Sequence, residues 1–142
     1  MAGGSYNQFC PVAKACELLQ PRWTLVILSE MWSGSTRFND IHRGVPGMSP
    51  TLLSRRLKEM EAGGLVHHDA TGYHSTAMAQ KLEPIVHALG QWAHEAIREL
   101  SKKGTSIRQI VRQTGHSRKL VRDVLRGQRL DVFRTRPSSL DS

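Results

Sequence analysis

Polar and basic side chains recur at intervals of three and four residues between positions 49 and 58. At about 100° per residue they share one face of a helix. Hydroxyl, ammonium and guanidinium groups on such a face donate hydrogen bonds to base edges and phosphates. The expected base-reading residues are Thr51, Ser54 and Arg55, the expected phosphate contacts are Arg37 and Lys58, and Ser49 is expected at the same surface.

The same segment carries the start and the end of a helix. Ser49 is a good N-cap, and Pro50 suits the first helical position because its missing N–H costs nothing there. Gly63-Gly64 supplies the residue of positive φ that ends the helix. The face opposite the donors is apolar and consists of Leu53, Leu57 and Met60.

Cys10 is the second group with potential chemistry. It precedes Pro11, so its thiol is expected at a helix N-terminus, where the helix dipole favours the thiolate. Cys10 is therefore a candidate redox sensor, and an unreactive cap or packing residue is the alternative.

Metal binding and catalysis find little support in the residue spacing. His67, His68 and His74 lie close together across a predicted hairpin, but no cysteine pair or carboxylate completes a known ligand pattern. The phosphate-binding Gly-rich loop with Lys, His-Glu-x-x-His and Gly-x-Ser-x-Gly patterns are absent from the sequence. We expect no metal, no cofactor and no enzymatic activity.

The elements that must position the polar face are mostly helices. Apolar spacing predicts helices at 11–19, 23–32 and 37–44, followed by a Pro46-Gly47 turn into the helix that begins at Pro50. Two β segments, 65–69 and 73–76, flank Ala70-Thr71-Gly72 and predict a hairpin. A hairpin directly after such a helix is the wing of a winged helix-turn-helix.

A further helix is predicted over 77–100, which Pro84 must begin or kink. Its apolar stripe is too wide for packing against one small domain and predicts a homodimer seam. The alternative is that this face closes the core of the chain itself. The stripe includes Leu82, Ile85, Leu89 and Trp92, with Ile97 beside them.

Length and charge divide the chain into two parts. The 142 residues suffice for one core with a small appendage: a DNA-binding and dimerisation domain over 1–103 and a basic tail over 104–142. The tail holds 9 of the 20 Lys and Arg residues but only 3 of the 12 acids, so it attracts phosphates. No signal-peptide pattern or apolar run of about 20 residues occurs, and the cysteines are too few for a disulfide framework. We expect a cytoplasmic protein without membrane contact.

The tail has its own pattern. Apolar residues recur at helical spacing on both sides of Thr114-Gly115, and Ser117 suits an N-cap, which predicts a second helix-turn-helix. Its expected DNA contacts are Arg118, Lys119 and Arg122. Such a motif usually needs a third helix, and the only available segment, 94–102, belongs to the long helix, so we expect the tail to fold poorly when free. The alternatives are a solvated basic tail and sequence acquired from a mobile element.

Five segments together resemble the HxlR-type winged-helix regulators of bacteria and archaea, over about 10–97. They are Cys10-Pro11-Val12, Arg22-Trp23-Thr24, Arg37-Phe38-Asn39-Asp40-Ile41, Ser49-Pro50-Thr51-Leu52-Leu53-Ser54-Arg55-Arg56-Leu57-Lys58-Glu59-Met60 and Gly64-Leu65-Val66. The resemblance implies a dimeric transcription factor whose recognition helices enter successive major grooves, with its N-terminal and long C-terminal helices at the dimer contact. Some HxlR-type regulators use a cysteine at the place of Cys10. The wing is shorter and less basic than is usual in the family, and Ala79 stands where a glycine is usual.

The tail, over about 104–134, resembles the helix-turn-helix of bacterial transposases and resolvases, including Asp131-Val132-Phe133-Arg134. HxlR-type proteins normally end before it. The expected fold is mainly α with a small β-hairpin: a winged helix-turn-helix, a long C-terminal dimerisation helix and a basic helical tail. The expected function is sequence-specific regulation of transcription by a homodimer on double-stranded DNA. The alternatives are a redox- or metal-sensing form of that regulator and a non-catalytic DNA-binding remnant of a mobile-element fusion.

Overall fold

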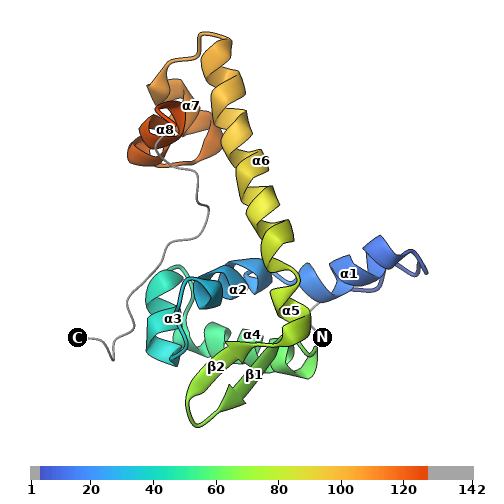
Figure 1. The fold of residues 1–142 in the computed structure, drawn as a ribbon. Helices are drawn as coiled ribbons and strands as arrows, with labels where there is room; N and C mark the ends of the chain where they lie inside the picture. Colours follow the sequence, from blue (N-terminus) through green and yellow to red (C-terminus); the bar gives the residue numbers. More distant parts are fainter. Residues whose placement is uncertain (1–3, 128–142) are drawn as a thin grey trace. The chain divides into compact units, whose positions relative to one another are not determined.

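Short helices and one hairpin make up the first part of the chain (Figure 1). The computed structural model describes residues 4–127, so Asp131-Val132-Phe133-Arg134 lies outside the described residues. The elements are α1 (Pro11–Leu19), α2 (Thr24–Trp32), α3 (Phe38–Gly44), α4 (Pro50–Ala62), β1 (Val66–Asp69), β2 (Gly72–Ser75) and α5 (Ala77–Gln80). The predicted winged helix-turn-helix is confirmed, with Trp23 and Arg37 lying just before their helices as N-caps.

One hydrophobic core joins these elements. Ile27 and Leu28 of α2, Ile41 of α3 and Leu53 and Leu57 of α4 are at most 1% exposed. These positions are the apolar ones of each helical repeat, so burying them fixes α3 and α4 against α2. The polar face of α4 is thereby directed away from the core.

The hairpin is anchored at its turn. β1 and β2 pair antiparallel, with His67 opposite His74. The Tyr73 N–H donates to the Thr36 carbonyl at 2.8 Å, which ties the wing to the chain entering α3. Gly72 has a φ of +126°, and a Cβ there would lie 2.6 Å from the Thr36 carbonyl oxygen, so this turn requires glycine.

The helix predicted over 77–100 is two helices, α5 and α6 (Glu83–Lys102). The Thr76 hydroxyl caps α5 by accepting from the Ala79 N–H at 3.2 Å, and Pro84 lies in the first turn of α6. A proline is tolerated there because the first-turn amides have no partner within the helix. In the described part of the chain no helix is both long and apolar enough to span a bilayer.

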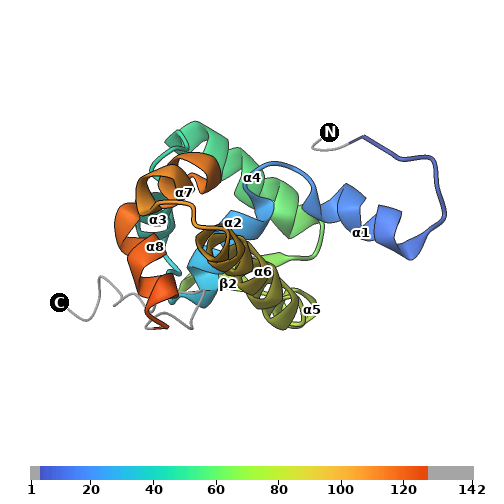
Figure 2. The same cartoon turned by 90° about the horizontal axis from the view of Figure 1, so that it is seen from above.

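The described chain divides into two compact units, residues 4–83 and 84–127. In the second unit α7 (Ile107–Thr114) and α8 (Arg118–Leu125) lie side by side (Figures 1 and 2). Their core combines Ile110, Val121 and Val124 with Ile97 of α6, all at most 1% exposed.

The expectation that the tail folds poorly for want of a third helix is therefore wrong. The last turns of α6 supply that helix, because Ile97 belongs to the core of the second unit. For the same reason the contacts divide the chain after Glu83, whereas the sequence placed the boundary after residue 103. Capping also supports the tail: Ser106 and Gln109 form a capping box, and Ser117 caps α8.

Candidate nucleic-acid interface

Helix α4 presents the predicted polar face. The Ser49 hydroxyl accepts a hydrogen bond from the Leu52 N–H at 3.1 Å and so caps the helix. Thr51, Arg55 and Lys58 are exposed. Ser54 beside them is partly buried. The structure therefore brings the predicted base-reading residues together on the side of α4 that faces away from the core.

The cations on this face have no competing partner. Neither Arg55 nor Lys58 forms an ion pair with any residue in the described range 4–127. An exposed cation without an intramolecular partner keeps its full capacity to bind phosphate or a guanine edge.

Arg56 is a structural residue that the sequence alone does not separate from its neighbour. Its Nε donates to the Arg22 carbonyl at 3.1 Å, and its guanidinium pairs with Glu59 at 2.7 Å. It therefore ties α4 to the chain before α2. Its helical position, about 100° from Arg55 toward the buried face, is the only local indication of this role.

The turn between α3 and α4 is held by side chains of α3. The His42 Nε2 lies 2.8 Å from the Met48 carbonyl oxygen, just before the cap of α4. Arg43 pairs with Asp40 at 2.8 Å, whereas Arg37, the N-cap of α3, is exposed and makes no ion pair with a described residue. Arg37 is thus the exposed cation at the start of the helix-turn-helix.

The wing carries an Asp69-centred cluster. Asp69 accepts from the hydroxyl and the N–H of Thr71, and His67 and His74 lie 3.5 and 3.6 Å from its carboxylate. The Thr71 hydroxyl and then the Thr71 N–H lower the pKa of Asp69, desolvation opposes them, and the electrostatic effects of His74 and His67 lower it by smaller amounts. No group of three His, Cys, Asp or Glu residues suited to a metal ion occurs within residues 4–127.

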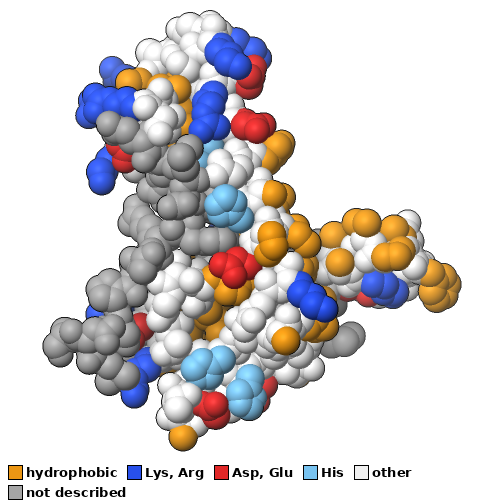
Figure 3. All heavy atoms as spheres, viewed as in Figure 1, with side chains coloured by type: hydrophobic (Ala, Val, Ile, Leu, Met, Phe, Trp, Pro, Cys, Tyr) orange, Lys and Arg blue, Asp and Glu red, His pale blue; other side chains and the backbone are white. Residues whose placement is uncertain are grey.

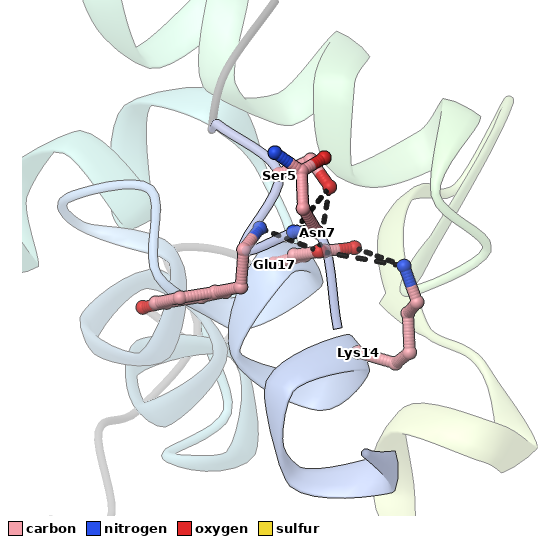
Figure 4. A network of polar contacts seen from close by, with 5 residues as sticks. Ser5, Asn7, Lys14 and Glu17 are labelled. Carbon is pink, nitrogen blue, oxygen red and sulfur yellow. Dashed lines mark hydrogen bonds and ion pairs between the residues drawn. The ribbon is translucent and has the colours of Figure 1, made fainter. Parts of the chain in front are cut away.

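Cys10 is an exposed N-cap residue of α1. Its side chain makes no cap hydrogen bond of ordinary geometry, but the backbone N–H groups of Ala13 and then Val12 lower the pKa of the thiol. The segment before it is held by Glu17, whose carboxylate accepts from the Tyr6 N–H at 2.9 Å (Figure 4).

The Glu17 carboxylate has two further partners, one in the segment before Cys10 and one in α1. The Ser5 hydroxyl donates at 3.2 Å and the Lys14 ammonium lies at 3.2 Å (Figure 4). The Tyr6 N–H, and after it Lys14, lower the pKa of Glu17. This network fixes the chain that leads to Cys10.

The predicted apolar stripe divides among three environments. Ile85, Leu89 and Trp92 of α6 are 58%, 50% and 73% exposed, and apolar side chains follow one edge of that helix in Figure 3. Leu82 packs partly buried against the core of residues 4–83. Ile97 is buried in the second unit. The wide stripe thus serves two cores of the chain and leaves three large side chains uncovered.

The predicted tail contacts lie on α8. Arg118, Lys119 and Arg122 are all exposed. Lys and Arg side chains gather over the unit that contains α7 and α8 (Figure 3).

Comparison with known proteins identifies the first of these helix-turn-helix motifs. The model of the HxlR-like helix-turn-helix family matches residues 18–101, which ends before α7. The HTH-type transcriptional regulator YvaP of Bacillus subtilis is 34% identical over 99 residues, covering 64% of this chain and 92% of YvaP.

Two solved structures share the fold. Quinone-bound YodB from B. subtilis is 29% identical with a TM-score of 0.55, over 61% of this chain and 99% of YodB. Diamide-treated YodB is 28% identical with a TM-score of 0.50, over 63% and 96% of the two chains. Since the family model spans more than half of the chain, including all of α4 and the wing, this protein belongs to the HxlR-like helix-turn-helix family and is a DNA-binding transcriptional regulator.

Proposed function

We propose that this regulator binds one two-fold symmetric site on double-stranded DNA as a homodimer, with α4 of each copy in a major groove. Base edges are contacted by Thr51, Ser54 and Arg55, and phosphates by Arg37, Ser49 and Lys58. The observation that carries this proposal is the exposed face of α4. It presents hydroxyls together with cations that form no ion pair with a described residue, and the opposite side of the helix is buried in the core. A rigidly backed helix with donors on its outer face is the element that reads the major groove.

Ser49 can cap α4 and contact a phosphate at the same time. Its oxygen accepts from the Leu52 N–H, and its own hydroxyl hydrogen remains able to donate to a phosphate oxygen. Substituting it would therefore change DNA affinity and α4 stability together, which makes Arg55 and Lys58 the better probes of DNA contact.

The dimer rests on Ile85, Leu89 and Trp92. They follow one another at gaps of four and three along α6, so they form one stripe on about two turns. Their exposure in the single chain is typical of a surface that a second copy covers, since a two-fold contact lets the same stripe pack on itself. Two copies would then carry two α4 helices, one for each half of a two-fold symmetric site.

Selection of binding sites from random duplex DNA tests the proposal. We expect a pseudo-palindrome whose half-sites are separated by about one helical turn, roughly 34 Å, because a two-fold dimer presents two recognition helices. An asymmetric selected sequence, or no enrichment at all with protein that is folded, would contradict it.

Sensing of electrophiles through Cys10 is a second candidate function. Two observations favour it: the thiol is exposed at a helix N-terminus that lowers its pKa, and the similar protein YodB has been solved with a bound quinone. The Cys10 thiolate would add to a ring carbon of a quinone, forming a C–S bond, and the ring would take up a proton to become a hydroquinone.

Mass spectrometry after brief exposure to benzoquinone near neutral pH tests this candidate. We expect one adduct on Cys10, no adduct in Cys10→Ser, and an unchanged adduct in the matched Cys16→Ser variant, whose thiol is only partly exposed in the native chain. Adducts that appear on Cys16 first, or DNA binding that is unaffected by the Cys10 adduct, would remove Cys10 as the sensor.

A further inference from the structure

Helices α7 and α8 lie beyond the match to the family model, which ends at residue 101, and they form one unit with the end of α6. Its three helices enclose one core of Ile97, Ile110, Val121 and Val124. Between α7 and α8 the chain turns through Gly115, at a φ of +74°, and α8 starts at the Ser117 cap. This is a second helix-turn-helix, whose two helices lie beyond the family match and whose core is completed by Ile97 of α6.

The outer faces of both helices are basic. On α8, Arg118, Lys119, Arg122 and Arg126 are exposed and fall within an arc of about 100°, on the side opposite the buried valines. On α7, the exposed Arg108 and Arg112 lie one turn apart, opposite Ile110.

None of these six cations is neutralised nearby. The segment 104–127 contains these six cations and one acidic residue, Asp123. None of the six forms an ion pair within the part of the chain that the structure describes. By contrast, Lys102 of α6 is paired with Glu99 at 3.1 Å. The charge on α7 and α8 is therefore available to an outside partner of opposite charge.

The face of α8 differs in kind from that of α4. The α4 face mixes hydroxyls with cations, whereas the outer arc of α8 consists of cations only. An arc of cations can hold the phosphate backbone of any duplex, and contacts to phosphates carry no sequence information.

We propose that residues 97–127 form a second, sequence-independent binding surface for double-stranded DNA, in which α7 and α8 hold the phosphate backbone while α4 reads the operator. Only this division of labour rests on the proposed function of α4. The phosphate contacts themselves depend on α7 and α8 alone.

Other polyanions fit this surface less well. Residues 97–127 contain no Phe, Tyr or Trp on which single-stranded bases could stack. The apolar side chains of α7 and α8 face the internal core, with Ile110 and Val121 fully buried, so no apolar face is left to enter a lipid surface. An outer face of exposed cations on two packed helices suits the phosphate backbone of a duplex.

The test uses the full chain with three charges removed from α8: Arg118→Gln, Lys119→Gln and Arg122→Gln. Because these side chains are exposed and lie outside the core, we expect an unchanged thermal melt. On both the selected operator and random duplex, the slope of log K against log salt should fall by about 2.7 for each copy of the chain bound, or about 5 for the proposed dimer, since each neutralised phosphate contributes about 0.9. The selected sequence should stay the same.

A matched control removes the same net charge elsewhere, through Lys14→Gln, Lys81→Gln and Lys102→Gln. Two of these lysines already lie in ion pairs, so we expect little change in the slope. A second control, Arg55→Ala, should lose part of the preference for the operator while keeping most of the binding to random duplex, because the phosphate contacts of both α4 and α8 remain.

Three results of the DNA assays would overturn the proposal. They are an unchanged salt slope in the α8 variant, an equal fall in the charge-matched control, and an altered selected sequence, which would make α8 a reading helix. Failure of the α4 proposal would give a different result, because the Arg55→Ala variant would then keep its full preference for the operator. The proposal would also be overturned if the α8 variant lost more binding to an RNA duplex or to anionic vesicles than to DNA.

Discussion

Alanine substitutions of two adjacent arginines on α4 should have different effects, one on DNA binding and the other on stability. Arg55 is exposed and pairs with no described residue, whereas Arg56 donates to the Arg22 carbonyl and to Glu59. The substitution, the helix and the charge removed are the same in both variants. Only the partner differs, so each variant is the matched control for the other.

The magnitudes follow from those contacts. Arg56→Ala removes two hydrogen bonds donated by a charged group, each worth up to about 1.5 to 3 kcal/mol in a buried setting. The Arg56 side chain is 18% and the Glu59 side chain 32% exposed, so water replaces part of that loss, and alanine gains about 0.2 kcal/mol in helix propensity. We expect the free energy of unfolding to fall by about 1 to 2 kcal/mol. For Arg55→Ala we expect a change within about 0.5 kcal/mol.

DNA binding should show the reverse order. Arg55→Ala should weaken the best site by about 1 to 3 kcal/mol, roughly 5- to 150-fold, and relax the preference at one base pair, because a bidentate contact to guanine is worth that much. Urea unfolding followed by tryptophan fluorescence gives the stabilities, and fluorescence anisotropy on the selected operator and its single-base variants gives the affinities. If Arg55→Ala weakens every sequence equally, its base-reading role is refuted. If it unfolds as readily as Arg56→Ala, the assignment of separate roles is refuted too.

Three further outcomes follow from the structure. Gly72→Ala should lower the free energy of unfolding by about 2 to 4 kcal/mol in urea titrations, because the positive φ is strained for alanine and the Thr36 carbonyl oxygen lies 2.6 Å from the new Cβ. Gly64→Ala has a positive φ but its nearest atom is at 3.6 Å, so it should lower that free energy by only about 1 to 2 kcal/mol. Leu89→Asp should give a monomer by light scattering, because it places a charge in the proposed seam, and a variant that stays dimeric would contradict that seam. The pKa of Glu17 is lowered in the folded chain, so its stabilising contribution is present above the unfolded value of about 4.3 and is lost as pH falls through the folded value. Amide NMR of the segment held by Glu17 should titrate below about 4.3, and a titration that persists in Glu17→Gln would contradict this.

Local signals in the sequence were sufficient for the recognition helix. Ser49-Pro50 and Gly63-Gly64 set its ends, and the spacing of Leu53 and Leu57 set its buried side, because capping and periodicity depend only on near neighbours. The role of Arg56 was not predictable in this way. Its acceptor, the Arg22 carbonyl, lies 34 residues away along the chain, and only the packed core brings the two together.

The break between α5 and α6 could not be predicted from the apolar periodicity of the sequence, for a different reason. An apolar stripe continues through Leu82, so periodicity alone predicts one helix. The structure shows that consecutive apolar positions serve different surroundings: Ala79 and Leu82 pack on the first core, and Leu89 lies exposed beyond Pro84. The Thr76 cap and the proline were the local signs of two helices.

The same reasoning explains why the tail should be probed by substitution and not by truncation. A helix can serve two surfaces if it uses different turns, and α6 does so: Leu89 and Trp92 are exposed in its middle, whereas Ile97 is fully buried near its end. Deleting the chain after Lys103 would remove α7 and α8 and leave Ile97 uncovered, next to the proposed dimer seam on the same helix. A new apolar patch there favours self-association, so a changed oligomeric state would report the lost core and not the lost charge. Replacing Arg118, Lys119 and Arg122 keeps the core of the second unit and removes only its charge, and a fall in the salt slope then has one physical cause.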